Sequence, residues 1–115
     1  MRESAIESAL VRRAKELGIY TAKFTSPSRR GVPDRIFIRG GVVLFLELKA
    51  PGEKPTKLQM REMWALRLRG ANVMWTDDLE MGRKLLGALA DERLTKTVEV
   101  DKELKVKNTC KLEYQ

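Results

Sequence analysis

Residues 31–49 read GVPDRIFIRGGVVLFLELK, and this stretch decides the fold because it predicts two strands joined by a tight turn. Two consecutive glycines separate the apolar runs, which is typical of a two-residue β-hairpin. Both runs also carry charge: Asp34 begins the first, and Glu47 and Lys49 lie near the end of the second. Charged side chains in a largely buried hairpin require a compensating partner.

The turn also predicts the register of the hairpin. Counting outward from Gly40 and Gly41 places Asp34 directly opposite Glu47. Side chains opposed in this way share one face of the sheet, with Cβ atoms about 4.5–5.5 Å apart. Lys49, two residues beyond Glu47, points to the same face. The sequence therefore predicts two carboxylates and one ammonium group together at one end of the hairpin.

Two opposed carboxylates repel each other, and a divalent cation that binds both would remove that cost. The chain has no histidine and one cysteine, Cys110, which excludes histidine-based catalysis and His- or Cys-rich metal sites. Oxygen ligands favour Mg²⁺ or Mn²⁺. The alternative is purely structural: Asp34 is a turn residue after Pro33, and Glu47 and Lys49 form an ion pair.

The composition predicts one folded, intracellular domain with an anionic partner. The 115 residues suffice for a modest core, and 43% of them are hydrophobic. No apolar run is long enough to cross a membrane, no secretory signal is visible, and one cysteine agrees with a reducing compartment. The net charge of +7 favours a polyanion such as nucleic acid.

The remaining patterns predict an α/β fold with a mixed central sheet and the order α-β-β-β-α-β-α. Helices are expected at 3–17, 56–69 and 78–94, and strands at 19–24, 34–39, 42–49 and 71–76. The last strand follows a helix and can therefore lie parallel to a neighbour. We expect residues 1–94 to form the domain. Residues 95–115 would be a C-terminal extension, either edge strands or an arm ordered by a partner chain.

Residues 23–59 resemble the VRR-NUC (virus-type replication-repair nuclease) family of the PD-(D/E)XK nuclease superfamily. The matching motifs are G-x-P-D, which ends at Asp34, E-x-K-A-P-G, which begins at Glu47, and a following glutamine, Gln59. The resemblance extends from the first helix to the strand at 71–76. It implies a restriction-endonuclease-like core and an endonuclease that depends on Mg²⁺ or Mn²⁺ and acts on DNA.

The resemblance also implies which residues act. Asp34, Glu47 and the main-chain carbonyl of Leu48 would bind the metal. Lys49 would position the attacking water and stabilise charge on the phosphate.

A glutamate of the first helix would complete the site, and the spacing fits Glu3 better than Glu7, which is one turn further on. Gln59 would lie near the lysine and the scissile phosphate. Thr56 and Gln59 also match a capping box, which would explain the glutamine without catalysis, and both roles can hold at once.

The loop before Asp34 is basic and is expected to hold the DNA backbone, although such loops are usually only solvated surface. The candidate contacts are Lys23, Ser26, Ser28, Arg29 and Arg30.

Two tryptophans and a basic helix face raise the question of further contacts with bases or phosphates. Trp75 lies in an apolar strand and Trp64 lies near methionines, so core packing is favoured for both. The face formed by Arg61, Arg67 and Arg69 is predicted to be solvated.

Stand-alone proteins that resemble this sequence are associated with branched DNA, particularly four-way (Holliday) junctions cut by a homodimer. The resemblance therefore implies a homodimeric, structure-selective endonuclease. Two alternatives remain: a non-catalytic nucleic-acid-binding module with the same fold, and a basic RNA-binding or ribosome-associated protein. Retention of Asp34, Glu47 and Lys49 favours the enzyme.

Overall fold

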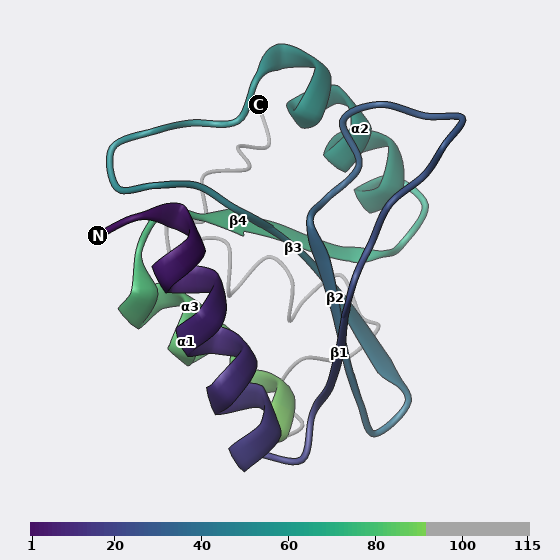
Figure 1. The fold of residues 1–115 in the computed structure, drawn as a ribbon. Helices are drawn as coiled ribbons and strands as arrows, with labels where there is room; N and C mark the ends of the chain where they lie inside the picture. The colour runs from purple at the N-terminus through teal and green to yellow at the C-terminus, as the bar shows by residue number, and fades with distance from the viewer. Residues whose placement is uncertain (92–115) are drawn as a thin grey trace.

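The structure is a computed structural model, and it describes residues 1–91. The elements are α1 (Glu3–Glu16), β1 (Tyr20–Lys23), β2 (Arg35–Arg39), β3 (Val42–Leu48), α2 (Lys57–Arg67), β4 (Asn72–Thr76) and α3 (Leu79–Ala90). Their order confirms the predicted α-β-β-β-α-β-α arrangement (Figure 1). The expected extension, 95–115, lies outside the described residues, so the division of the chain near residue 94 stays a prediction.

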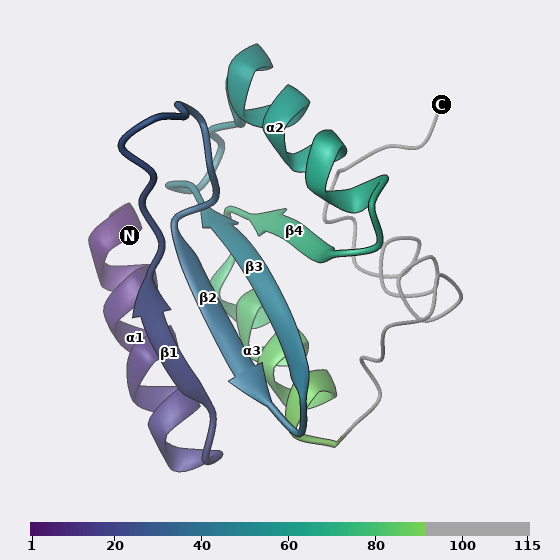
Figure 2. The ribbon, with the colours of Figure 1, turned by 90° about the vertical axis from the view of Figure 1, so that its right-hand side faces the viewer.

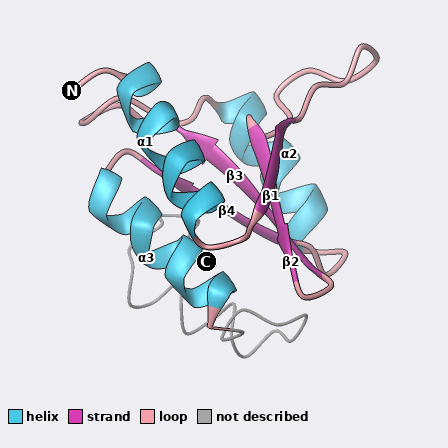
Figure 3. Ribbon diagram, turned by 60° about the horizontal axis from the view of Figure 1, so that its bottom comes forward, coloured by secondary structure: helices cyan, strands magenta, loops and turns pink. Residues whose placement is uncertain are grey.

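The four strands form one mixed sheet in the order β1-β2-β3-β4. The first three strands are antiparallel neighbours, and β4 runs parallel to β3. Figure 3 shows α1 and α3 on one side of this sheet and α2 on the other. The strand β3 is therefore interior in its sheet and covered on both faces, which explains why its sequence is apolar at nearly every position.

The hairpin between β2 and β3 has the register predicted from its glycines. Arg35 pairs with Leu46, and Arg39 pairs with Val42. Gly40 and Gly41 have φ angles of 61° and 79°, the left-handed values that a two-residue turn of this kind requires. The strand pairing thus ends one residue short of Asp34 and Glu47, and it brings these two positions together.

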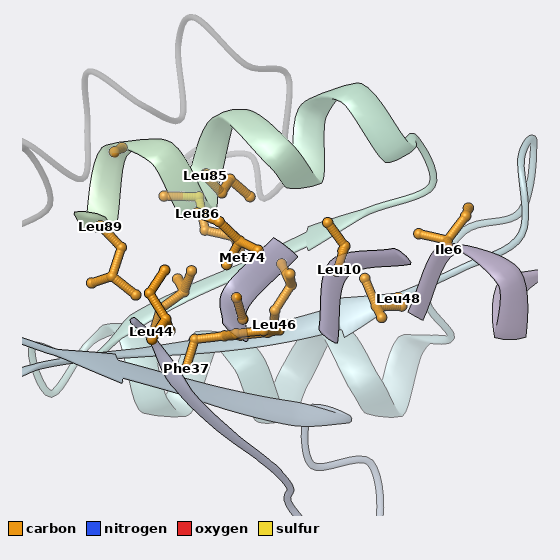
Figure 4. Close-up of a cluster of buried hydrophobic side chains, with 13 residues drawn as sticks. Ile6, Leu10, Phe37, Leu44, Leu46, Leu48, Met74, Leu85, Leu86 and Leu89 are labelled. Atoms are coloured by element: carbon orange, nitrogen blue, oxygen red, sulfur yellow. The ribbon is translucent and has the colours of Figure 1, made fainter. Parts of the chain in front are cut away.

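The main core lies between the sheet and the pair of helices α1 and α3 (Figure 4). Its fully buried side chains include Ile6, Leu10, Phe37, Leu44, Leu46, Leu48, Met74, Leu85, Leu86 and Leu89. A smaller cluster of Met63, Val73 and Trp75 lies on the α2 side, with Trp64 packed against it. Core packing of both tryptophans is therefore confirmed. No helix within residues 1–91 is long and apolar enough to traverse a lipid bilayer.

Two predicted details of the fold are wrong. The last helix ends at Ala90, before the predicted end near residue 94, and Asp91 is its C-cap. Arg67 is not solvated: it is 7% exposed and donates a hydrogen bond to the main-chain oxygen of Val73. It lies one turn after Met63 on the α2 face that meets β4, where its guanidinium satisfies a strand carbonyl. Arg61 and Arg69 are exposed, as predicted.

The contact between α1 and α3 gives a matched pair of glycine substitutions. A Cβ atom at Gly82 would lie 2.7 Å from Leu10 Cδ1, whereas a Cβ atom at Gly87 would meet no atom within 4 Å. Gly87→Ala should stabilise the protein by about 0.5–1 kcal/mol through helix propensity. Gly82→Ala should lose that gain and be less stable than Gly87→Ala by about 1–3 kcal/mol because the core is overpacked. Urea unfolding of both variants measures the difference, and equal stabilities would contradict the close approach of α1 to α3.

Candidate active site

The Asp34 carboxylate lies at the end of the hairpin, beside the last residues of β3. Pro33 before it is buried, and the main-chain oxygen of Asp34 accepts a hydrogen bond of 2.8 Å from the Phe24 N–H. Its side-chain Oδ2 accepts a hydrogen bond of 3.0 Å from the Leu48 N–H. The backbone therefore fixes Asp34 next to Glu47 and Leu48, as the register predicts.

The Glu47 side chain is buried and only partly compensated. It is 2% exposed, and its Oε2 lies 3.4 Å from Lys49 Nζ. Its Oε1 is buried and has no hydrogen-bond partner among the described residues. Burial and the nearby Asp34 carboxylate raise the pKa of Glu47 to about 7, against the opposing effect of Lys49. The ion pair of the purely structural explanation is present, but it leaves one carboxylate oxygen unsatisfied.

An unsatisfied carboxylate oxygen beside a second carboxylate suits a divalent cation. The predicted donors, Asp34, Glu47 and the Leu48 carbonyl, come from adjacent positions of the hairpin. Within residues 1–91, no three His, Cys, Asp or Glu side chains form a group that could hold a metal ion. The donor set is therefore a pair of carboxylates together with main-chain oxygen, and Glu3 is not part of a closed three-carboxylate cluster.

Glu3, the first residue of α1, interacts electrostatically with this pair. Burial raises the pKa of Glu3, the Asp34 carboxylate raises it further, and Lys49 opposes the shift. The first turn of α1 is thus near enough to Asp34 and Lys49 for their charges to act on Glu3, although these residues form no cluster of three carboxylates.

Glu7, the other candidate from α1, is engaged elsewhere. Its Oε2 accepts hydrogen bonds from Arg35 Nη1 at 2.7 Å and from Lys23 Nζ at 3.1 Å. Burial raises the pKa of Glu7, but these hydrogen bonds outweigh that effect and hold the pKa below its usual value. Glu7 is therefore committed to an ion-pair network, and Glu3 is the better candidate to complete the site.

The capping box at Gln59 is present. Thr56 N–H donates to Gln59 Oε1 at 2.8 Å, and Gln59 N–H donates to Thr56 Oγ1 at 3.1 Å. The carbonyl oxygen of the Gln59 side chain is thus used to cap α2. Its amide NH₂ group is what remains for a phosphate, so the catalytic role of Gln59 stays a prediction.

The basic loop is held against α2 rather than solvated throughout (Figure 2). Arg29 donates from Nε and Nη2 to the two carboxylate oxygens of Glu62, at 2.6 and 2.8 Å. Gly31, with a φ of 82°, packs so closely that an added Cβ atom would lie 3.1 Å from Leu58 Cγ. Of the predicted phosphate contacts, Arg29 is therefore a loop anchor, and Lys23 is paired with Glu7.

The other predicted contacts in this loop remain accessible. Arg30 and Ser28 are exposed and Ser26 is half-buried. The loop after Lys49 is also tied down, because the Gly52 N–H donates to Asp77 Oδ2 at 3.0 Å. The loops on both sides of the carboxylate pair are thus fixed to the rest of the domain.

Sequence reasoning missed the anchors of the site. Arg35 and Glu62 are buried charged residues, each paired with a residue far away along the chain: Glu7 and Arg29. The need for a partner could have been predicted for Arg35. Its position in the strand places it on the core face, where an unpaired charge is costly.

Comparison with known proteins agrees with this fold. No family model matches the sequence. The chain is 44% identical over 82 residues to the protein named "Putative nuclease p44" of Acyrthosiphon pisum secondary endosymbiont phage 1, over 70% of this chain and 88% of the relative. A solved structure described as "VRR_NUC domain" shares 31% identity and superposes with a TM-score of 0.68, covering 74% of this chain and 94% of that one.

A mixed four-stranded sheet flanked by helices is the fold of a VRR-NUC nuclease domain. The chain belongs to the VRR-NUC family.

The raised pKa of Glu47 predicts how stability depends on pH in the absence of metal. The folded pKa, about 7, lies above the ordinary value of 4.5, so the folded state loses stability as pH rises between these values. In EDTA, Glu47→Gln should therefore be more stable than wild type at pH 8, by about 1–3 kcal/mol. At pH 4 the two proteins should differ little, because the wild-type carboxyl group is then protonated. Urea unfolding at both pH values measures this.

Glu16→Gln is the matched control for that experiment, because Glu16 is exposed on α1 and forms an ion pair with Arg13 on its own helix. It should change the free energy of unfolding by less than about 0.5 kcal/mol at either pH. A Glu47→Gln difference that does not vary with pH would contradict the buried, partly compensated carboxylate.

Proposed function

We propose that this protein is an endonuclease that depends on Mg²⁺ or Mn²⁺ and hydrolyses phosphodiester bonds of DNA. The observation that carries the proposal is the buried, unsatisfied Oε1 of Glu47 beside Asp34. The proposal also draws support from the VRR-NUC fold and from the nuclease name of the phage relative.

The residues of the site have distinct roles in this proposal. Asp34, Glu47 and the main-chain carbonyl of Leu48 would hold the metal, and Glu3 would complete the site from α1. The bound metal would lower the pKa of a water molecule and neutralise charge that develops on the phosphate. Lys49, already beside Glu47, would orient the attacking water and donate to a phosphate oxygen.

The DNA backbone would approach along the loop 25–33 and the N-terminus of α2. Arg30 and the serines Ser26 and Ser28 offer donors there, and a helix N-terminus favours an anionic group. The amide group of Gln59 lies on that first turn of α2 and would reach the same phosphate. Lys23, which is 69% exposed, would add charge from the end of β1.

We further propose that the substrate is branched DNA, such as a four-way junction, and that the protein acts as a homodimer. Contacts from Ser26, Ser28 and Arg30 to phosphates would position DNA without reading its bases, so selectivity would come from DNA shape. Two symmetric sites suit a junction with two-fold symmetry. Resemblance to stand-alone VRR-NUC proteins supports this, and an intracellular location would give access to such DNA.

A non-catalytic nucleic-acid-binding module is the second candidate function. It is favoured by one observation, that no three metal-ligating side chains form a ready cluster in residues 1–91. It leaves the cost of burying Glu47 without explanation, because binding to a basic surface needs no buried carboxylate.

Cleavage of labelled DNA tests the choice between these functions. A four-way junction, a flap and a plain duplex of matched sequence are incubated with the protein in Mg²⁺, Mn²⁺ or EDTA. We expect cleavage with either metal and none in EDTA. Lys49→Ala and Asp34→Asn should each lower the cleavage rate by about 10²–10³-fold, because each removes a group that contacts the reacting centre.

Lys84→Ala is the matched control, because Lys84 is an exposed lysine of α3 on the far side of the sheet. Its cleavage rate should equal that of wild type. Undiminished cleavage by Lys49→Ala, or cleavage that survives EDTA, would rule out the proposed mechanism. Binding of the junction without cleavage in either metal would support the binding module.

Substrate shape and assembly are tested separately. Light scattering after size exclusion should give twice the chain mass of 13.2 kDa. Competition binding should favour the junction over the duplex by at least about tenfold, since a dimer contacts two arms at once. A monomer that cuts duplex and junction equally would refute shape selectivity while leaving the nuclease activity in place.

A further inference from the structure

The position of Glu3 is not fixed by its own helix. Glu3 begins α1, and the N-cap residue, Arg2, makes no side-chain capping hydrogen bond. By contrast, Thr56 caps α2 and Asp78 caps α3 with side-chain hydrogen bonds. The first turn of an uncapped helix leaves its N–H groups to water and opens readily. Glu3 therefore needs a contact outside its own helix to hold it near the carboxylate pair.

The ion pair between Glu7 and Arg35 is such a contact, because it joins α1 to the sheet. Arg35 Nη1 donates to Glu7 Oε2 at 2.7 Å, and the arginine is only 9% exposed. Its guanidinium is oriented by a second bond, from Nε to Thr21 Oγ1 at 3.2 Å, and Thr21 in turn donates to the Ile36 main-chain oxygen at 2.8 Å. The arginine is thus held by the sheet, and it holds α1 through Glu7.

The pair lies close to both halves of the site: Glu7 is one helical turn from Glu3, and Arg35 directly follows Asp34. Glu3 and Glu7 are four residues apart and share a helix face, one turn from each other. Asp34 and Arg35 are successive residues, and their side chains point to opposite faces of the strand. The buried stripe of α1 at Ile6 and Leu10 fixes which face of the helix meets the core. A hydrogen-bonded ion pair is directional and can set the rotation more finely.

We propose that Arg35 and Glu7 are positioning residues, whose ion pair sets the rotation of α1 so that Glu3 faces Asp34 and Lys49. Lys23 also bonds Glu7, but it is largely exposed and contributes less. This inference rests on the proposed nuclease function. It assigns to Arg35 and Glu7 an effect on metal binding that they exert only through Glu3.

A double-mutant cycle tests the proposal on the full chain. Arg35→Met, Glu3→Gln and the double variant are compared with wild type. The Mn²⁺ dissociation constant is measured by electron paramagnetic resonance without DNA, and kcat and KM are measured on a four-way junction. Arg35→Met should weaken Mn²⁺ binding and lower kcat by about 10-fold to 100-fold, the usual effect of losing an outer partner of a metal site. KM should change little.

The double variant should be no worse than Glu3→Gln alone, because both changes remove the same contribution. A residue that merely stabilised the fold would give independent, additive losses. Glu7→Gln keeps a hydrogen-bond acceptor for Arg35 and should retain more Mn²⁺ affinity than Arg35→Met. This variant keeps the test decisive if Arg35→Met does not fold.

Asn72→Ala is the control for general destabilisation. It removes a buried amide that donates to the Val43 carbonyl at 3.2 Å, at the opposite end of β4 from the site. It should lower the melting temperature and leave Mn²⁺ affinity unchanged.

Two results would overturn the proposal. One is Arg35→Met with wild-type Mn²⁺ affinity and kcat, and the other is fully additive losses in the double variant. If the wild-type protein neither binds Mn²⁺ nor cuts DNA, the nuclease function itself falls, and this inference falls with it. Measuring wild type first separates that failure from the failure of the positioning role alone.

Discussion

The register of the β2–β3 hairpin is the constraint on which the rest of the structure depends. Side chains alternate between faces along β3, so a shift of one residue would exchange its two faces. Glu47 would then enter the core that Leu46 and Leu48 now fill, and these leucines would face the other way. The present register satisfies packing and chemistry together: the leucines meet α1 and α3, while the carboxylates meet each other. The turn at Gly40 and Gly41 determines both the packing of the leucines and the opposition of the carboxylates.

The features that could be predicted from the sequence are those encoded by neighbouring residues. The turn at Gly40 and Gly41 has a local geometric requirement, so the hairpin and the opposition of Asp34 and Glu47 followed from counting. The capping box at Thr56 is likewise local. The same reasoning limited the possible folds. Each helix and strand has a periodic pattern of its own, and the order of elements allows few sheet topologies.

The features that could not be predicted are pairings between residues distant in sequence. Arg29 was expected to meet phosphate, yet it meets Glu62, which lies on a helix that packs beside the loop only in the folded state. Arg67 was expected in solvent, but it packs between α2 and β4 and donates to the Val73 carbonyl, whereas Arg61 and Arg69 are exposed. The branched substrate and the dimer were inferred from family resemblance, and no described contact specifies them. Composition and periodicity do not indicate which of several arginines pairs with which distant residue.

The contact between Gly31 and Leu58 has a consequence for how such a protein can diversify. A side chain at Gly31, where the loop 25–33 rests on α2, would crowd Leu58, and the left-handed backbone there also disfavours any other residue. The exposed tip nearby, at Ser28 and Arg30, carries no such restriction. The exposed side chains of the loop proposed to meet DNA can therefore change while the position of the loop relative to Asp34 is kept. A new substrate preference can arise in this family by exchanging exposed side chains on a loop whose path is held fixed.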